Sequence, residues 1–134
     1  MGKFSRDKGA RGERQLVADL REVFPEFEVK RGLGQARGGE EVPDIAGIPN
    51  WHIESKCGKK QNPRAALAQA IAQAKEGHTP VAVVRDDHKE PFALLLWEDF
   101  LQVLKCLDWK KYNERTITVR SRRGRKILPG SAAT

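Results

Sequence analysis

The sequence has few cysteines and histidines and no long apolar run. Its 134 residues include two Cys and three His, too few and too widely spaced for a disulfide framework or a zinc site. We expect Cys57 and Cys106 to be small buried apolar residues in a reducing cytoplasm. No apolar stretch approaches the roughly 20 residues that span a bilayer, and the N-terminal residues are too polar for a secretory signal. These absences predict a cytoplasmic protein with no membrane partner.

The glycine-rich segment 32–39 lacks the two common phosphate-binding motifs. No Gly-Lys-Ser or Gly-Lys-Thr follows it, as a P-loop requires, and it runs toward Pro43 rather than into a helix, which excludes a dinucleotide fingerprint. We therefore expect no small-molecule substrate. A loop that lies over a larger substrate and an ordinary connector are equally good interpretations of this segment.

Acidic residues are absent after Glu114, although the chain as a whole carries 18 of them. The basic residues of this region are Arg115, Arg120, Arg122, Arg123, Arg125 and Lys126. The formal net charge is +7 and the pI is about 9.7, which favours a polyanionic partner because Lys and Arg near phosphates release condensed counterions. The basic segment is either a solvated tail or an arm that contacts nucleic-acid backbone, and we favour the arm.

Apolar periodicity predicts one domain of the α/β (α+β) class, with a central mixed five-stranded sheet flanked by helices. The expected helices are 9–24, one that Asn62-Pro63 opens and Gly77 closes, and 98–107; the expected strands are 27–31, 42–46, 51–57, 80–85 and 92–97. Their order is α-β-β-β-α-β-β-α. Residues 1–110 form the predicted core, and residues 111–134 form a basic C-terminal extension of the same domain.

The last predicted helix has an apolar stripe that we expect to point inward. Its members are Phe100, Leu101, Leu104 and Leu107. The longer segment 94–104, which includes Trp97, is apolar enough to be core, subunit interface or both.

Two carboxylates and one ammonium lie along the predicted second and third strands. Asp44 follows a proline, and nine residues separate it from Glu54, with Lys56 two positions further. Period-two alternation puts Glu54 and Lys56 on one face of the sheet, and Asp44 joins them if the register sets it opposite Glu54. Mg²⁺ binds through one or two carboxylates plus phosphate and water, and a positioned Lys can stabilise charge on a phosphate. The pattern predicts a magnesium-dependent phosphodiesterase.

Four further residues lie near this constellation in the predicted fold. Glu13 continues the apolar face of the first helix, so it is a candidate to complete a metal shell, although a lone Glu in a first turn usually only favours the helix dipole. Gln69 and Gln73 line one flank of the second helix, where a solvated position is the alternative to a role in the site. His52 shares the face of Glu54, and we expect it to be solvent-exposed or to make a cross-strand contact rather than to act as a general base.

Three segments resemble the PD-(D/E)XK nuclease superfamily, and above all the archaeal-type Holliday junction resolvases and their phage relatives. They are Lys8–Val17, Pro43-Asp44 and Ile53–Lys56, and the resemblance extends with gaps to about residue 105. It implies a restriction-endonuclease-like core and a homodimer that binds four-way DNA junctions by shape. It also implies symmetric cutting of two strands with Mg²⁺ or Mn²⁺ in a bacterial, archaeal or phage-infected cell.

The resemblance also assigns roles to individual residues. Glu13, Asp44, Glu54 and Lys56 fall on the family's catalytic positions, the three carboxylates as metal ligands, and Gln69 matches a glutamine near the active site. Arg14 and Arg31 match basic positions that contact DNA. The other basic residues that we expect at the DNA are Lys8, Arg11, Arg37, Arg120, Arg122 and Arg123.

The chain departs from the family in its longer glycine-rich stretch and its basic C-terminal segment, and both departures bear on substrate choice. A structure-selective or restriction-like nuclease of the same fold is therefore one alternative function. A DNA-binding architectural protein without catalysis is the other.

Overall fold

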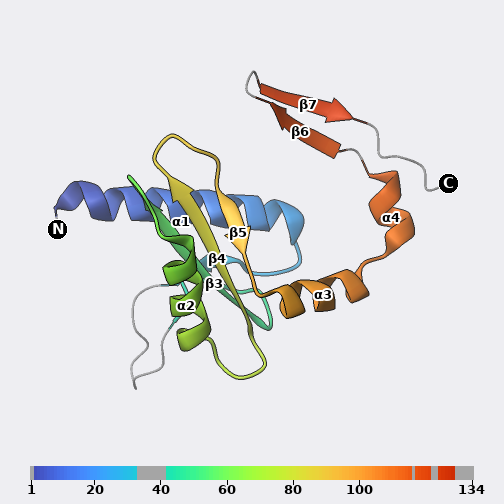
Figure 1. Ribbon diagram of the computed structural model, residues 1–134, viewed down its shortest axis with the longest axis horizontal. Helices are drawn as coiled ribbons and strands as arrows, with labels where there is room; N and C mark the ends of the chain where they lie inside the picture. Colours follow the sequence, from blue (N-terminus) through green and yellow to red (C-terminus); the bar gives the residue numbers. More distant parts are fainter. Residues whose placement is uncertain (1, 33–41, 116, 122–123, 129–134) are drawn as a thin grey trace. The chain divides into compact units, whose positions relative to one another are not determined.

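A five-stranded mixed sheet organises the N-terminal part of the computed structural model, which describes residues 2–32, 42–115, 117–121 and 124–128 (Figure 1). Along the chain, the elements of this part are α1 (Lys3–Val23), β1 (Lys30–Arg31), β2 (Ile45–Ala46), β3 (Trp51–Gly58), α2 (Pro63–Gln73), β4 (Thr79–Asp86) and β5 (Phe92–Leu94). The spatial order is β1-β2-β3-β4-β5, with β3 and β4 parallel and the other neighbours antiparallel. The fold is α+β with a mixed open sheet, and the predicted order of these elements is confirmed.

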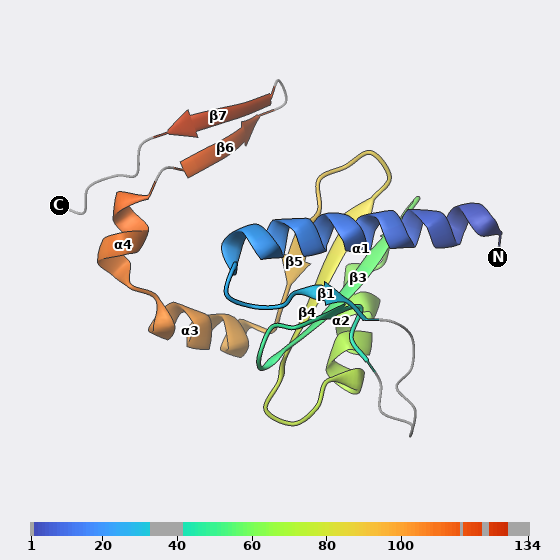
Figure 2. The same cartoon turned by 180° about the vertical axis from the view of Figure 1, so that it is seen from behind.

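The two helices of this part cover opposite faces of the sheet (Figures 1 and 2). α1 packs on the face that carries Ile53 and Val81, and α2 packs on the face that carries Ala82 and Val84. Parallel strands need a crossover connection, usually a helix, and α2 supplies it between β3 and β4. The face that α2 covers is also the face of Glu54, because side chains alternate along β3.

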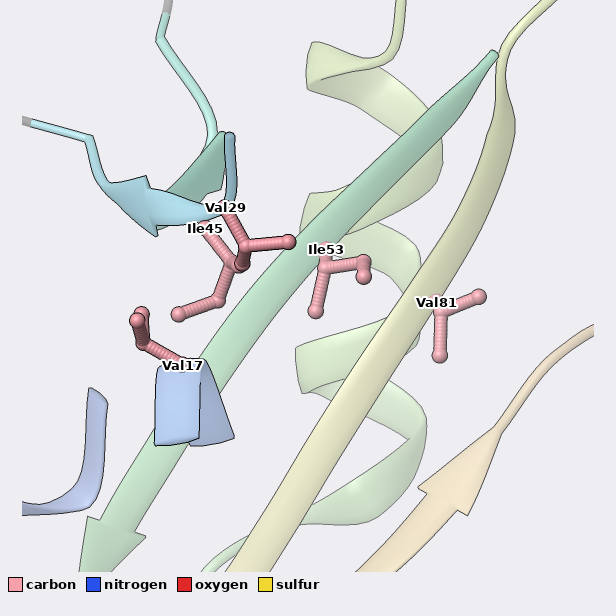
Figure 3. Packing of buried hydrophobic residues seen from close by; sticks show 5 residues of the cluster. All are labelled: Val17, Val29, Ile45, Ile53 and Val81. Carbon is pink, nitrogen blue, oxygen red and sulfur yellow. The ribbon is translucent and has the colours of Figure 1, made fainter. Parts of the chain in front are cut away.

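The larger hydrophobic core lies between α1 and the sheet (Figure 3). Its buried members are Val17, Val29, Ile45, Ile53 and Val81. The second core joins α2 to β4 and is built largely from alanines, among them Ala66 and Ala82. Small side chains let the backbone of α2 lie close to the sheet, so this second core is thin.

Several element boundaries differ from the predicted ones. α1 begins at Lys3 rather than at residue 9, because its first turns carry no apolar stripe and periodicity alone could not detect them. β2 is confined between Pro43, which has no N–H for a ladder, and Gly47, whose φ of +101° ends the strand. α2 is capped by Asn62, whose side chain accepts a hydrogen bond from Ala65 N–H at 3.1 Å, but it ends at Gln73 rather than at Gly77.

Residues 97–134 form a second compact unit. It consists of α3 (Trp97–Cys106), α4 (Trp109–Glu114) and a hairpin of β6 (Ile117–Ser121) and β7 (Gly124–Leu128). The last predicted strand ran to Trp97, which instead begins α3, where acidic residues in the first turn favour a helix N-terminus. No element had been predicted after residue 107.

Two predictions about burial are wrong. None of the α3 side chains is buried. Phe100 and Leu101 are exposed, and Leu104 and, just past the helix, Leu107 are half-buried, although all four were expected to point inward. Periodicity determines which residues share a helix face, whereas burial also needs a second apolar surface against that face. Cys106 is likewise exposed and Cys57 is half-buried. Among the helices of the described ranges, none has the length and apolar character needed to cross a membrane.

Candidate active site

Asp44 lies opposite Glu54 on neighbouring strands. Ile45 of β2 pairs with Ile53 of β3, so extension of this antiparallel register by one residue places Asp44 against Glu54. This is the register that the prediction required, and it brings Asp44 to β3 beside Glu54, whose side chain lies on the face that α2 covers. Lys56 follows on the same face of β3 and is half-buried.

The side chain and the backbone carbonyl group of Asp44 both accept hydrogen bonds from backbone amides. Its Oδ2 atom accepts a hydrogen bond from Ser55 N–H at 2.8 Å, and its carbonyl oxygen accepts one from Gly32 N–H at 2.8 Å. The first bond ties the carboxylate to β3 beside Glu54, and the second ties the Asp44 backbone to the end of β1.

Gly32 is required for this arrangement. A Cβ atom added to it would lie 1.8 Å from the Pro43 carbonyl oxygen, far inside any permitted contact. Only glycine lets the chain after β1 approach Pro43 and Asp44 so closely. The sequence predicted Gly32 only as part of a loop, because several other glycines follow it in the same segment.

Glu54 is buried and hydrogen-bonded to a histidine of its own strand. The His52 Nε2 and Glu54 Oε1 atoms are 2.7 Å apart, and the two side chains are 3% and 5% exposed. His52 was expected to be solvent-exposed or to make a cross-strand contact. It is not exposed, because α2 covers the face of β3 on which both residues lie. The sequence does contain a signal for this pair, because residues two positions apart in a central strand lie on the same buried face.

Glu13 is ion-paired and belongs to the other layer. Its Oε2 atom lies 2.8 Å from Arg31 Nε, on the helix that packs against Ile53 rather than against Glu54. In the described ranges, no group of three or more Asp, Glu, His or Cys side chains is placed to hold a metal ion. The structure therefore places Asp44 and Glu54 opposite each other but does not bring Glu13 into one such group with them.

Gln69 is exposed on α2, next to the buried Ala70. Gln69 therefore lies on the helix that covers the face of Glu54, which is the side of the sheet on which it was predicted. Gln73, one turn further, is half-buried. A role for Gln69 in the site stays a prediction.

A basic depression lies where α1 passes β1. Four cationic side chains border it: Arg14, Arg21, Lys30 and Arg31. Arg14 and Arg31 were predicted to contact DNA, and the structure places them at one surface. Arg21 and Lys30 were missed, although Arg21 follows Arg14 by seven residues and so shares its helix face. The Arg21 Nε atom donates to the Val29 carbonyl oxygen at 2.8 Å, which fixes the orientation of this side chain.

The remaining predicted DNA contacts differ in their surroundings. Lys8 forms a 2.8 Å ion pair with Asp87, and the hydrogen bond from its ammonium is the main reason that the pKa of Asp87 is lowered. Arg11 is exposed on α1. Arg120 belongs to β6. Arg37, Arg122 and Arg123 lie outside the described residues.

Comparisons with known proteins add no assignment to this geometry. No model of a known protein family matches the sequence, and no curated protein matches it. The functional interpretation therefore depends on the residues themselves: two opposed carboxylates, a lysine on the same face, and a basic depression in the same unit.

Proposed function

We propose that this protein is a metal-dependent DNA endonuclease that resolves four-way junctions by paired, symmetric phosphodiester hydrolysis. The observation that carries the proposal is the register of β2 and β3, which sets Asp44 opposite Glu54 with Lys56 on the same face. A buried charge must be paired, hydrogen-bonded or bound to a metal, and hydrogen bonds hold both carboxylates at this position.

The donor set fits Mg²⁺, with Mn²⁺ as a substitute. Both opposed side chains offer hard oxygen atoms, and Mg²⁺ needs only one or two protein carboxylates when phosphate and water complete its shell. An ion held there would neutralise charge on the phosphate and lower the pKa of water. Asp44 and Glu54 would hold it, whereas Glu13 is ion-paired with Arg31 on the helix of the other layer, and its role as a third ligand stays a prediction.

The protein's own groups supply the remaining functions. The Ser55 amide orients the Asp44 carboxylate through a 2.8 Å hydrogen bond. The Lys56 ammonium would stabilise charge on the scissile phosphate and orient the attacking water. Gln69, on the helix above this face, would contact the substrate or the water near it.

DNA as the substrate is supported by charge. The basic depression offers four cations to a phosphodiester backbone, and the net charge of +7 favours a polyanion over an uncharged partner. The four-way junction and the homodimer follow from the resemblance to junction resolvases, in which a two-fold enzyme cuts a two-fold substrate. The five-stranded sheet with a helix between its two parallel strands agrees with a restriction-endonuclease-like core.

A nuclease of the same fold with another DNA substrate is the second candidate. Phosphate contacts position a protein on nucleic acid but carry no direct information about its sequence or branching. The basic depression therefore serves duplex, flap or nicked DNA equally well.

The proposal is tested by cleavage of a labelled synthetic four-way junction beside matched linear duplex, flap and single-stranded DNA, with Mg²⁺ and with EDTA. Paired, metal-dependent cuts confined to the junction support the resolvase. Cutting of every substrate supports the second candidate. Binding without cutting would leave an architectural DNA-binding protein.

The matched variant for this assay is Asp44→Asn. It keeps the size of the side chain but removes a metal-binding charge, so we expect cleavage to be lost and DNA binding to be preserved or strengthened. Normal cleavage by this variant contradicts the assigned site.

A further inference from the structure

The buried contact between His52 and Glu54 is not used by the proposed reaction. Alternate residues of a strand lie roughly 7 Å apart, and the distal nitrogen of an imidazole bridges this separation where a shorter side chain does not. The contact is 2.7 Å long and almost wholly removed from solvent. A carboxylate that binds a cation is ionised and only accepts hydrogen bonds, so in the metal-bound site Nε2 would be the donor of this contact.

From this contact we propose that His52 is a positioning residue for the cation site: its Nε2–H group holds the Glu54 carboxylate in the orientation that binds the metal ion. The inference rests on the proposed function. Glu54 has three side-chain torsions, whereas the imidazole ring is rigid and is itself buried on the same strand. A carboxylate offers about four lone-pair positions, so the hydrogen bond from His52 is compatible with a cation on the same group.

The surroundings of the pair favour this role over simple core packing. The buried apolar residues on this face of the sheet include Ala66, Ala82 and Val84, with Asp44 and Lys56 beside Glu54. An apolar residue at position 52 would suit such a layer, whereas a buried charged carboxylate needs a hydrogen-bond donor. Partners that hydrogen-bond a metal-binding side chain typically change metal affinity or activity by about 10- to 100-fold when they are removed.

The first test uses the unaltered protein. The chain has three histidines, so their imidazole ¹⁵N–¹H signals can be assigned individually, with His78 and His88 as internal controls. We expect Mg²⁺ to shift the Nε2 signal of His52 in a saturable manner, at the concentrations at which the ion binds, and to leave the two controls unchanged. A His52 signal that does not respond while Mg²⁺ binds overturns the proposal.

The second test separates the hydrogen bond from packing. His52→Leu keeps much of the volume and removes the donor, and His52→Gln retains a donor of similar reach. Val81→Ala is the matched control, because Val81 is buried on the opposite face of the sheet and its truncation lowers stability without contact to Glu54. Calorimetry should show that Mn²⁺ binds about 10- to 100-fold more weakly to His52→Leu, that His52→Gln recovers most of the affinity, and that Val81→Ala binds as the parent protein does.

The outcomes distinguish this inference from the proposed function. A parent protein that cleaves DNA with Mg²⁺, together with a His52→Leu variant of unchanged Mn²⁺ affinity, overturns only the role of His52. A parent protein that neither binds Mn²⁺ nor cleaves overturns both. If His52→Leu does not fold, the Mg²⁺ response of the His52 signal decides the question.

Discussion

A methyl group at position 32 tests whether Gly32 positions Asp44. In Gly32→Ala the new Cβ atom would lie 1.8 Å from the Pro43 carbonyl oxygen, whereas ordinary contacts begin near 3.4 Å, so the two segments must separate by about 1.6 Å. The same separation breaks the 2.8 Å hydrogen bond from Gly32 N–H to the Asp44 carbonyl oxygen. Asp44 would therefore move relative to Glu54.

Two terms determine the magnitude. Overpacking at a close contact typically costs about 1–3 kcal/mol, and the net loss of one hydrogen bond costs about 0.5–1.5 kcal/mol. We expect the free energy of unfolding to fall by roughly 2–4 kcal/mol, which leaves a protein of ordinary stability folded. A displacement of about 1 Å in a catalytic geometry can lower the rate by about 10²-fold, so cleavage should fall at least that far.

The assay is junction cleavage under single-turnover conditions beside urea unfolding. Gly9→Ala is the matched control, since a Cβ atom there meets nothing within 4 Å and alanine in a helix interior stabilises by about 1 kcal/mol relative to glycine. The control should cleave normally and unfold at a higher urea concentration. Cleavage and stability of Gly32→Ala equal to those of the parent protein would refute the positioning of Asp44 by Gly32.

Three further predictions concern charge. The pKa of Asp87 lies below its ordinary value of 3.8 because of the hydrogen bond from Lys8. The ion pair therefore stabilises the fold above pH 3.8, and this stabilisation is lost as the pH falls through the lowered pKa. Lys8→Met should be less stable than the parent protein at neutral pH and equal to it in acid, and a difference that persists in acid contradicts the pairing. Arg21→Gln and Lys30→Gln should each weaken binding uniformly across DNA sequences and reduce the salt slope by about 1, whereas unchanged slopes would remove the basic depression from the DNA interface. Truncation after Glu114 should flatten the salt dependence of DNA binding and leave unit 1–96 folded, and an unchanged slope would mean that the basic segment is solvated.

Much of the fold could be predicted from local pattern. The parallel strands β3 and β4 are apolar runs with clear ends, and Asn62-Pro63 is a recognisable helix start, so these elements lie close to their predicted positions. The order of elements through α3 follows from the same signals. The hairpin of β6 and β7 was missed because its charged residues masked the strand pattern.

The candidate site was predictable only in part. The alternation of β3 puts Glu54 and Lys56 on one face, and the spacing to Asp44 states which register would bring the carboxylates together. Whether β2 adopts that register depends on the turn between the strands, which no local pattern specifies. The ion pair that holds Glu13 was not predictable for the same reason, because Arg31 lies eighteen residues away along the chain.

By itself, the sequence determined the class of fold, the basic charge and the three residues at the centre of the site, since these depend on composition and on the period of one strand. Only the tertiary structure decided that His52 is buried against Glu54, that Gly32 touches Pro43, and that Arg21 and Lys30 join one basic depression. The physical reason is that periodicity reports which residues share a face, whereas burial and contact depend on what a distant segment places against that face.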